Sequence, residues 1–294
     1  MTELLQTTID GLSIGSIYAL AAIGLTLVYG ILKLVNFAHG DFMTLGGYVA
    51  FAVNVSAGVN IGLAILAALA AVALLGLASE YAIWRPMRRR GAGMLQLLLL
   101  SLGFAFVIRY MIQFQWTGQL RQLDVDATKA FNPGDLTISY VQLIVIAGAG
   151  TILALVAILL KTTMLGKSMR ALADNFDLAQ VSGIDTSRVI AVTWLLAAGL
   201  AGLAGVATAI YQSLLTPDTG FVLLLSVFAA VIVGGIGNAY GALAGGLLIG
   251  LTQEWSTIGG LVPVEYKETV GFAILILALL IRPQGIFGHA VRAA

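Results

Sequence analysis

The sequence predicts an all-α protein, a polytopic transmembrane helical bundle. Of its 294 residues, 60% are hydrophobic and only 10% are charged, and the mean hydropathy is +0.99. An ordinary soluble domain carries roughly 25% charged residues, which help to cover its outside. The apolar runs recur at about 20 residues, the length of helix that crosses a ~30 Å hydrocarbon core.

Nine apolar segments are candidates for spans, and we expect about eight to nine crossings. They cover residues 11–32, 40–57, 61–83, 94–112, 139–160, 189–210, 221–237, 241–256 and 262–281. The second holds Asp41, Asn54 and three glycines, so it also fits a broken or re-entrant helix. The ninth carries Pro263 and three charged residues near its start, which leaves an apolar run too short to span alone.

The basic residues gather on one side of this scheme, which the positive-inside rule makes the cytoplasmic side. Arg121, Lys129 and Lys267 fall on the other side, and Arg109 lies near a span end. The carboxyl terminus is therefore predicted in the cytoplasm, and the amino terminus outside if the second segment crosses. The predicted cytoplasmic residues are Lys33, Arg85, Arg88, Arg89, Arg90, Lys161, Lys167, Arg170, Arg188, Arg282 and Arg292.

The connections and the glycines indicate one membrane domain over residues 1–294. The longest outer connection, 113–138, has no apolar run long enough for a domain of its own. Gly241 and Gly245, like Gly246 and Gly250, lie one helical turn apart, a spacing that lets helix backbones approach closely in membranes. We expect tight bundle packing there, with glycines lining a permeation path as the alternative.

The titratable residues argue against several classes of function. The chain has no cysteine, and its two histidines are too few and too far apart for a metal cluster. Glu80, Arg109 and Glu254 are predicted near span ends, where long side chains reach the interface. The spans then carry almost no charge at mid-depth, unlike those of ion-coupled transporters or an intramembrane enzyme. A transport protein of this composition takes its energy from elsewhere.

A charged segment, 166–188, lies between two long apolar runs within a predicted cytoplasmic connection of about 161–188. Its apolar residues recur at helical spacing, so we expect one short amphipathic helix across the membrane end. Asp174 follows Arg170 by four residues, a weakly favourable pair on that helix. Gly183 suits the position after the helix end, and Asp185 can cap the next helix. The helix is either an ordinary interfacial helix or a docking element for a cytosolic partner.

A polar group, Asn36, His39 and Asp41, lies beside Gly40 between the first two segments. One interpretation is a solvated turn in which Asp41 caps the next helix. The other is a broken helix beside a solute path, whose backbone dipoles bind or gate a zwitterion. Tyr18 is a further candidate for lining such a path, although tyrosine in a bundle more often serves packing.

Four stretches, in order along nearly the whole chain, carry a specific pattern. The first reads GLSIGSIYALAAIGLTLVYGILKLVNFAHGDF and contains the run N-F-A-H-G. The second reads GKSMRALADNFDLAQVSGIDTSRVIAVTW and continues as LLAAGLAGLAGV. The last two read AAVIVGGIGNAYGALAGGLLIG and LLIRPQGIFG. Together they resemble the permeases of the branched-chain amino acid ABC transporter family, and in particular the shorter permease subunit of that family.

The resemblance implies a transport subunit rather than an enzyme, located in the bacterial inner membrane among lipid and without a nucleic-acid partner. It implies a second, related permease, two cytosolic ATPases that bind ATP and Mg, and an extracytoplasmic solute-binding protein. No cofactor is expected in this chain. The family's ATPase-coupling role falls on Gly166, Arg170, Ala171, Asp174, Asn175 and Gly183.

Two alternatives remain at this point. A self-contained secondary transporter or facilitator of a small polar solute comes from a different functional class. Within the resembling family, some members import urea or short amides, and Phe37 and Asp41 fit the amino-acid branch better. The solute itself is not readable from the sequence.

Overall fold

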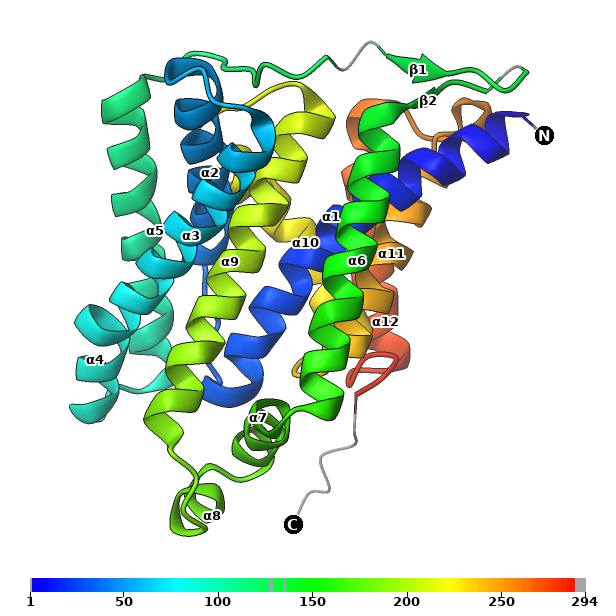
Figure 1. Ribbon diagram of the computed structural model, residues 1–294. Helices are drawn as coiled ribbons and strands as arrows, with labels where there is room; N and C mark the ends of the chain where they lie inside the picture. Colours follow the sequence, from blue (N-terminus) through cyan, green and yellow to red (C-terminus); the bar gives the residue numbers. More distant parts are fainter. Residues whose placement is uncertain (1, 127–128, 135, 289–294) are drawn as a thin grey trace.

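The computed structural model describes residues 2–126, 129–134 and 136–288. Over these residues the fold is all-α apart from one short antiparallel pair of strands, β1 (Ala130–Phe131) and β2 (Ile138–Ser139), as Figure 1 shows. Among the described residues, five helices are long and apolar enough to cross a membrane. They are α1 (Thr2–Leu32), the continuous helix from α3 (Ile61–Ser79) to α4 (Arg85–Arg89), α5 (Met94–Trp116), α6 (Tyr140–Thr162) and α9 (Thr186–Gln212).

Each of the nine predicted segments contains a helix, but four of these helices are short. They are α2 (Ala38–Phe51), α10 (Thr219–Gly234), α11 (Ala239–Trp255) and α12 (Lys267–Ile281). A π-helical turn, Ala52–Ser56, extends α2, and another, Glu80–Trp84, joins α3 to α4. Two 3₁₀ turns, Ile258–Gly260 and Val264–Tyr266, precede α12 because Pro263 interrupts the helical run there. The structure thus confirms an all-α membrane protein, and the count of eight to nine crossings stays a prediction.

The helices form an inner group and an outer group. In α1, 94% of the most apolar window is buried by other helices, whereas only 22% of the corresponding window of α3–α4 is buried. Helices α5 and α6 are similarly exposed, and α9 is mostly buried. Since exposed apolar helices in a membrane face hydrocarbon or another membrane subunit, α3, α5 and α6 form an apolar outer layer around α1 and α9.

The predicted glycine packing is confirmed, and the two glycine pairs face different neighbours. Gly246 and Gly250 of α11 lie against the α1 backbone, where an added Cβ would overlap Ala19 and Gly15. Gly241 and Gly245 lie against α10 in the same way. Helix α11 is therefore held between α1 and α10 by backbone contact on two faces, the arrangement that small residues allow in membranes.

Two short helices, α7 (Met164–Asp174) and α8 (Phe176–Val181), lie at one end of the bundle together with α4 (Figure 1). The two strands and the start of α1 lie at the opposite end. The basic residues predicted to share a side include those of α4, α7 and the ends of α1 and α6, all at the α7–α8 end. Arg292 lies outside the described residues.

Candidate functional site

Helix α2 starts deep inside the bundle rather than at its surface. After α1 ends at Leu32, residues 33–37 are not helical, and Lys33 adopts a positive φ of 51° as the chain turns back. The His39 Nε2 atom lies 2.9 Å from the carbonyl oxygen of Ala21. Ala21 is eleven residues before Leu32, a distance of about 16 Å along the helix at 1.5 Å per residue. The start of α2 is therefore near the mid-height of α1.

The three polar residues at this start are buried. Asn36, His39 and Asp41 are each at most 1% exposed, so the interpretation as a solvated turn is wrong. Asp41 lies within the first turn of α2 and does not cap it; instead, the Asn36 Oδ1 atom accepts a hydrogen bond of 3.1 Å from the Ala38 amide. The segment is a broken helix, and Ser101 Oγ of α5 takes the place of water by accepting a 3.1 Å hydrogen bond from the freed Phe37 amide.

Asp41 forms an ion pair with Arg109 of α5, at the centre of a three-residue charged cluster. The Arg109 Nε atom donates to Asp41 Oδ1 at 2.9 Å, and Nη2 donates to Asp41 Oδ2 at 3.1 Å. Arg109 Nη1 lies 3.6 Å from Asp218 Oδ1, at the start of α10. The guanidinium is stacked 4.3 Å from the centre of the Phe221 ring. We call Asp41, Arg109 and Asp218 the charged triad.

Glu254 does lie at the end of α11 and Glu80 directly after α3, as predicted, but the prediction that Glu80, Arg109 and Glu254 snorkel to the interface is wrong, because all three are buried. Arg109 and Glu254 are 8% exposed and Glu80 is 3% exposed. Helix α5 continues seven residues beyond Arg109, or about 10 Å. Each of the three has a partner of opposite charge, because a buried charge needs compensation: Glu80 pairs with Arg88, and Glu254 Oε1 accepts a 2.6 Å hydrogen bond from Lys267 Nζ.

The starts of α2 and α10 meet beside the triad. An added Cβ on Gly40 or on Gly220 would overlap the backbone of the other glycine. The Gly220 amide donates a 3.0 Å hydrogen bond to Thr44 Oγ1. Helix amino ends carry partial positive charge, so two such ends and one guanidinium face two carboxylates here. The arrangement suits the binding of small charged groups, and Asp218 leaves one side of it exposed.

Tyr18, the fourth candidate for the path, belongs to a separate polar chain. Its hydroxyl donates to Gln253 Oε1 at 3.1 Å, and Gln253 Nε2 donates to Ser226 Oγ at 3.3 Å. These bonds connect α1, α11 and α10. The structure therefore brings Asn36, His39 and Asp41 together and leaves Tyr18 in a neighbouring cluster.

At the α7–α8 end, α7 is fixed rigidly to the last turn of α6. Gly166 packs so closely on the carbonyls of Leu159 and Leu160 that an added Cβ would overlap them. Arg170 Nη1 donates a hydrogen bond to the Leu160 carbonyl, and Thr163 Oγ1 caps α7 by accepting from the Gly166 amide at 3.1 Å. Gly166 and Arg170 thus hold α7 in place.

The predicted single amphipathic helix is wrong in one respect, because the segment forms two helices that break at Asn175. Asn175 Oδ1 caps α8 by accepting from the Leu178 amide at 2.9 Å, and short polar side chains favour such caps over helix interiors. The predicted Arg170–Asp174 pair is also absent from the ion pairs of the described residues, since Arg170 turns toward α6. Gly183 does follow the helix end with φ +85°, and Asp185 caps α9 through the Arg188 amide at 3.0 Å.

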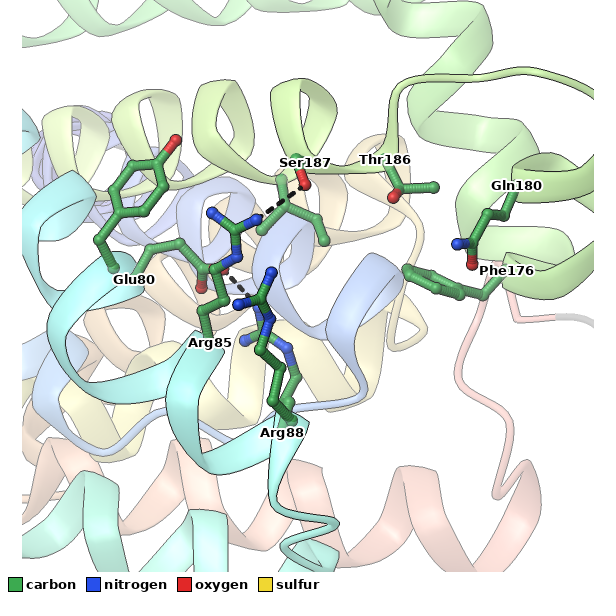
Figure 2. A pocket seen from close by; sticks show the side chains of 10 residues that line it. Glu80, Arg85, Arg88, Phe176, Gln180, Thr186 and Ser187 are labelled. Atoms are coloured by element: carbon green, nitrogen blue, oxygen red, sulfur yellow. Dashed lines mark hydrogen bonds and ion pairs between the residues drawn. The ribbon is translucent and has the colours of Figure 1, made fainter.

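A cleft of about 300 Å³ lies between α4 and α8, beside the start of α9, as Figure 2 shows. Glu80, Arg85 and Arg88 lie on one wall, where Arg85 Nη2 approaches Ser187 Oγ at 3.5 Å. Phe176 and Gln180 of α8 lie on the other wall. The cleft offers guanidinium groups next to a short exposed helix, which suits docking of a protein with acidic and apolar side chains.

The comparison with known families decides the class of this protein. The family described as branched-chain amino acid transport system / permease component matches residues 7–279. The chain belongs to this family. No solved structure matches the chain significantly.

Similar permeases are known from bacteria and from an archaeon. The high-affinity branched-chain amino acid transport system permease protein BraD of Pseudomonas aeruginosa is 32% identical over 97% of this permease and 96% of its own length. LivH of Salmonella typhimurium is 34% identical with the same coverage. A probable LivH of Methanocaldococcus jannaschii is 31% identical over 93% of this permease and 89% of the LivH chain. LivM of Escherichia coli, also named a permease protein of this transport system, is 22% identical over 95% of this permease and 69% of its own length.

Sequence reasoning missed two members of the charged triad of this permease. Arg109 stands in an apolar run, which is by itself a signal for a functional residue within a membrane. Asp218 follows Pro217 in a short connection and carried no signal of its own. Only the return of the chain between α9 and α10 brings Asp218 to Arg109.

Proposed function

We propose that this protein is the transmembrane permease subunit of an ATP-binding-cassette importer that moves branched-chain or other neutral amino acids inward. The single observation that carries the proposal is similarity over nearly the full length to permeases named for branched-chain amino acid transport. The five long apolar helices fit a membrane subunit. The alternatives are a self-contained secondary transporter and a urea or short-amide importer of the same family.

The proposed assembly contains a second permease related to this one, two cytosolic ATPases and an extracytoplasmic solute-binding protein. ATP and Mg bind to the ATPases, and this chain, as one membrane domain of eight to nine spans, binds neither. The α7–α8 end then faces the cytoplasm of a bacterial cell, together with the carboxyl terminus. The gathering of arginines at α4 supports this orientation through the positive-inside rule.

The coupling role is proposed for Gly166, Arg170, Ala171, Asp174, Asn175 and Gly183. The first two fix α7 to α6, so a push on α7 reaches the span without being absorbed by a flexible joint. Asp174 and Asn175 are exposed at the break between α7 and α8, where a partner makes contact. The solute path is proposed beside the start of α2, close to Asn36, His39, Asp41 and Tyr18.

The docking role is tested by reversing the charge of one exposed residue and measuring how much ATPase still assembles with the permease. Asp174→Lys is expected to reduce the amount of ATPase that co-purifies at least tenfold, with a parallel loss of ATP-driven uptake in proteoliposomes. Glu265→Lys, an exposed acid near the start of α12 at the opposite end, is the matched control and retains both. Full ATPase recovery with Asp174→Lys overturns the docking role.

The same vesicles separate the alternatives. The chain alone, without any ATPase, accumulates no solute on an ion gradient if the proposal is correct, whereas a secondary transporter does. With the complete complex, unlabelled urea or acetamide in excess leaves leucine uptake unchanged, and strong competition favours the short-amide importer.

A further inference from the structure

The Asp218 side chain is exposed although it lies within the bundle, at a depth where a carboxylate cannot contact lipid. Its side chain is 66% exposed, yet it contacts Arg109, about 10 Å inside the end of α5. Asp41 belongs to the same triad. It precedes Ser56, the end of the π-helical extension of α2, by fifteen residues, or about 22 Å along the helix axis. A carboxylate at such depth faces water or protein, because contact with hydrocarbon is too costly. This face of α5 and α10 therefore borders an aqueous path or the partner permease.

On this exposed face, the triad leaves the Arg109 Nη1 donor and the Asp218 carboxylate without an ordinary hydrogen bond to each other. Asp41 occupies the Nε and Nη2 atoms of Arg109. The remaining Nη1 atom is 3.6 Å from Asp218 Oδ1, longer than the 2.7–3.2 Å of an ordinary hydrogen bond of this kind. A free amino acid carries a carboxylate and an ammonium on one carbon, and these two groups complement Arg109 Nη1 and the Asp218 carboxylate.

The surroundings of the pair suit the rest of an amino acid with an apolar side chain. The rings of Phe221 and Phe106 lie 4.3 and 5.4 Å from the Arg109 guanidinium and hold its plane in place. Val222, four residues after Asp218, is exposed on the same face of α10. Leu225 continues this apolar strip by one further turn. A charged pair thus stands at the head of an apolar strip.

We propose that Arg109 Nη1 and the Asp218 carboxylate form a binding subsite for the carboxylate and the ammonium of a zwitterionic amino acid. The solute inserts between the two side chains, while Asp41 holds the guanidinium in position. The subsite rests on the proposed function, since it assumes that an amino acid passes this face. It assigns a recognition role to the permease itself, in addition to that of a solute-binding protein.

The test uses the absence of cysteine from the natural sequence. A single Val222→Cys variant, assembled with its partners in detergent, is treated with a charged, membrane-impermeant thiol reagent. We expect modification, and we expect millimolar leucine to slow it at least fivefold. The analogues 4-methylpentanoate, which lacks the ammonium, and 3-methylbutylamine, which lacks the carboxylate, are expected to give no protection. Adding Asp218→Asn to Val222→Cys is expected to abolish the protection by leucine.

Two controls make every outcome decisive. Leu155→Cys, exposed on helix α6 of the apolar outer layer, is expected to remain unmodified. Asp126→Asn, an ion-paired acid of the connection before α6, replaces Asp218→Asn and is expected to leave the protection intact. An unreactive Val222→Cys, equal protection by all three compounds, or protection that survives Asp218→Asn overturns the subsite. Absence of ATP-driven uptake of leucine and of every other neutral amino acid by the unaltered complex instead overturns the proposed function.

Discussion

Removal of the cation from the charged triad is the sharpest test of the structure. In Arg109→Gln, the Asp41 carboxylate loses two charge-assisted hydrogen bonds while it remains 0% exposed. Removing one partner of a buried ion pair typically costs about 3–5 kcal/mol, because the remaining charge has no compensation. For a chain of this size, such a loss lowers the thermal midpoint by roughly 10 °C.

The assay is the thermal denaturation midpoint of the purified chain in detergent, followed by tryptophan fluorescence. The double variant Asp41→Asn with Arg109→Gln removes both charges, and we expect it to recover at least half of the loss. Asp218→Asn is expected to shift the midpoint by less than 3 °C, because exposed ion pairs contribute about 0–1 kcal/mol. The reasoning is refuted if Arg109→Gln melts within 2 °C of the natural chain, or if the double variant is no more stable than Arg109→Gln.

Two further predictions concern packing and capping. Gly205→Ala is expected to destabilise the chain by about 1–3 kcal/mol, because the new methyl overlaps the Met43 backbone where α9 crosses α2. Gly148→Ala on α6, which has open space around it, is the control. Equal thermal denaturation midpoints for the two variants contradict the close approach of α9 to α2. Asn175→Ala removes the cap of α8 at a cost of about 1 kcal/mol. We expect faster amide hydrogen exchange confined to the first turn of α8. Unchanged exchange in that turn rules out the cap.

The sequence predicts the helices well because each apolar run must bury or face hydrocarbon along its whole length, and helix is the conformation that satisfies its backbone. The glycine pairs of α11 were predictable for a similar local reason, since a spacing of four residues places them on one face. Gly183 and Asp185 were found because their roles at helix ends depend on their immediate neighbours alone.

The charged triad depends on information that is not local. Asp41 and Arg109 are 68 residues apart, and their pairing follows from α2 starting at mid-height beside α5. From the sequence alone, Asn36, His39 and Asp41 fitted either a water-exposed turn or a site buried in the protein. The break at Asn175 escaped notice because the apolar pattern runs through both α7 and α8, while the choice between a helix interior and a cap depends on one side-chain hydrogen bond.

The positions of α1 and α2 suggest how events at the two ends of the bundle are coupled. Helix α7 packs against α6 and α1, and α1 is buried over most of its apolar length, with Gly11 and Gly15 in close contact with the backbone of α11. His39 binds the Ala21 carbonyl at the middle of α1, so a shift of α1 relative to its neighbours carries the start of α2 with it. Asp41 lies on that start, so the same shift changes its position relative to Arg109, which contacts Asp41 and Asp218 at the same time. We propose that a push on α7 reaches the charged triad by this series of contacts, from α7 to α1, from Ala21 to His39 and from Asp41 to Arg109.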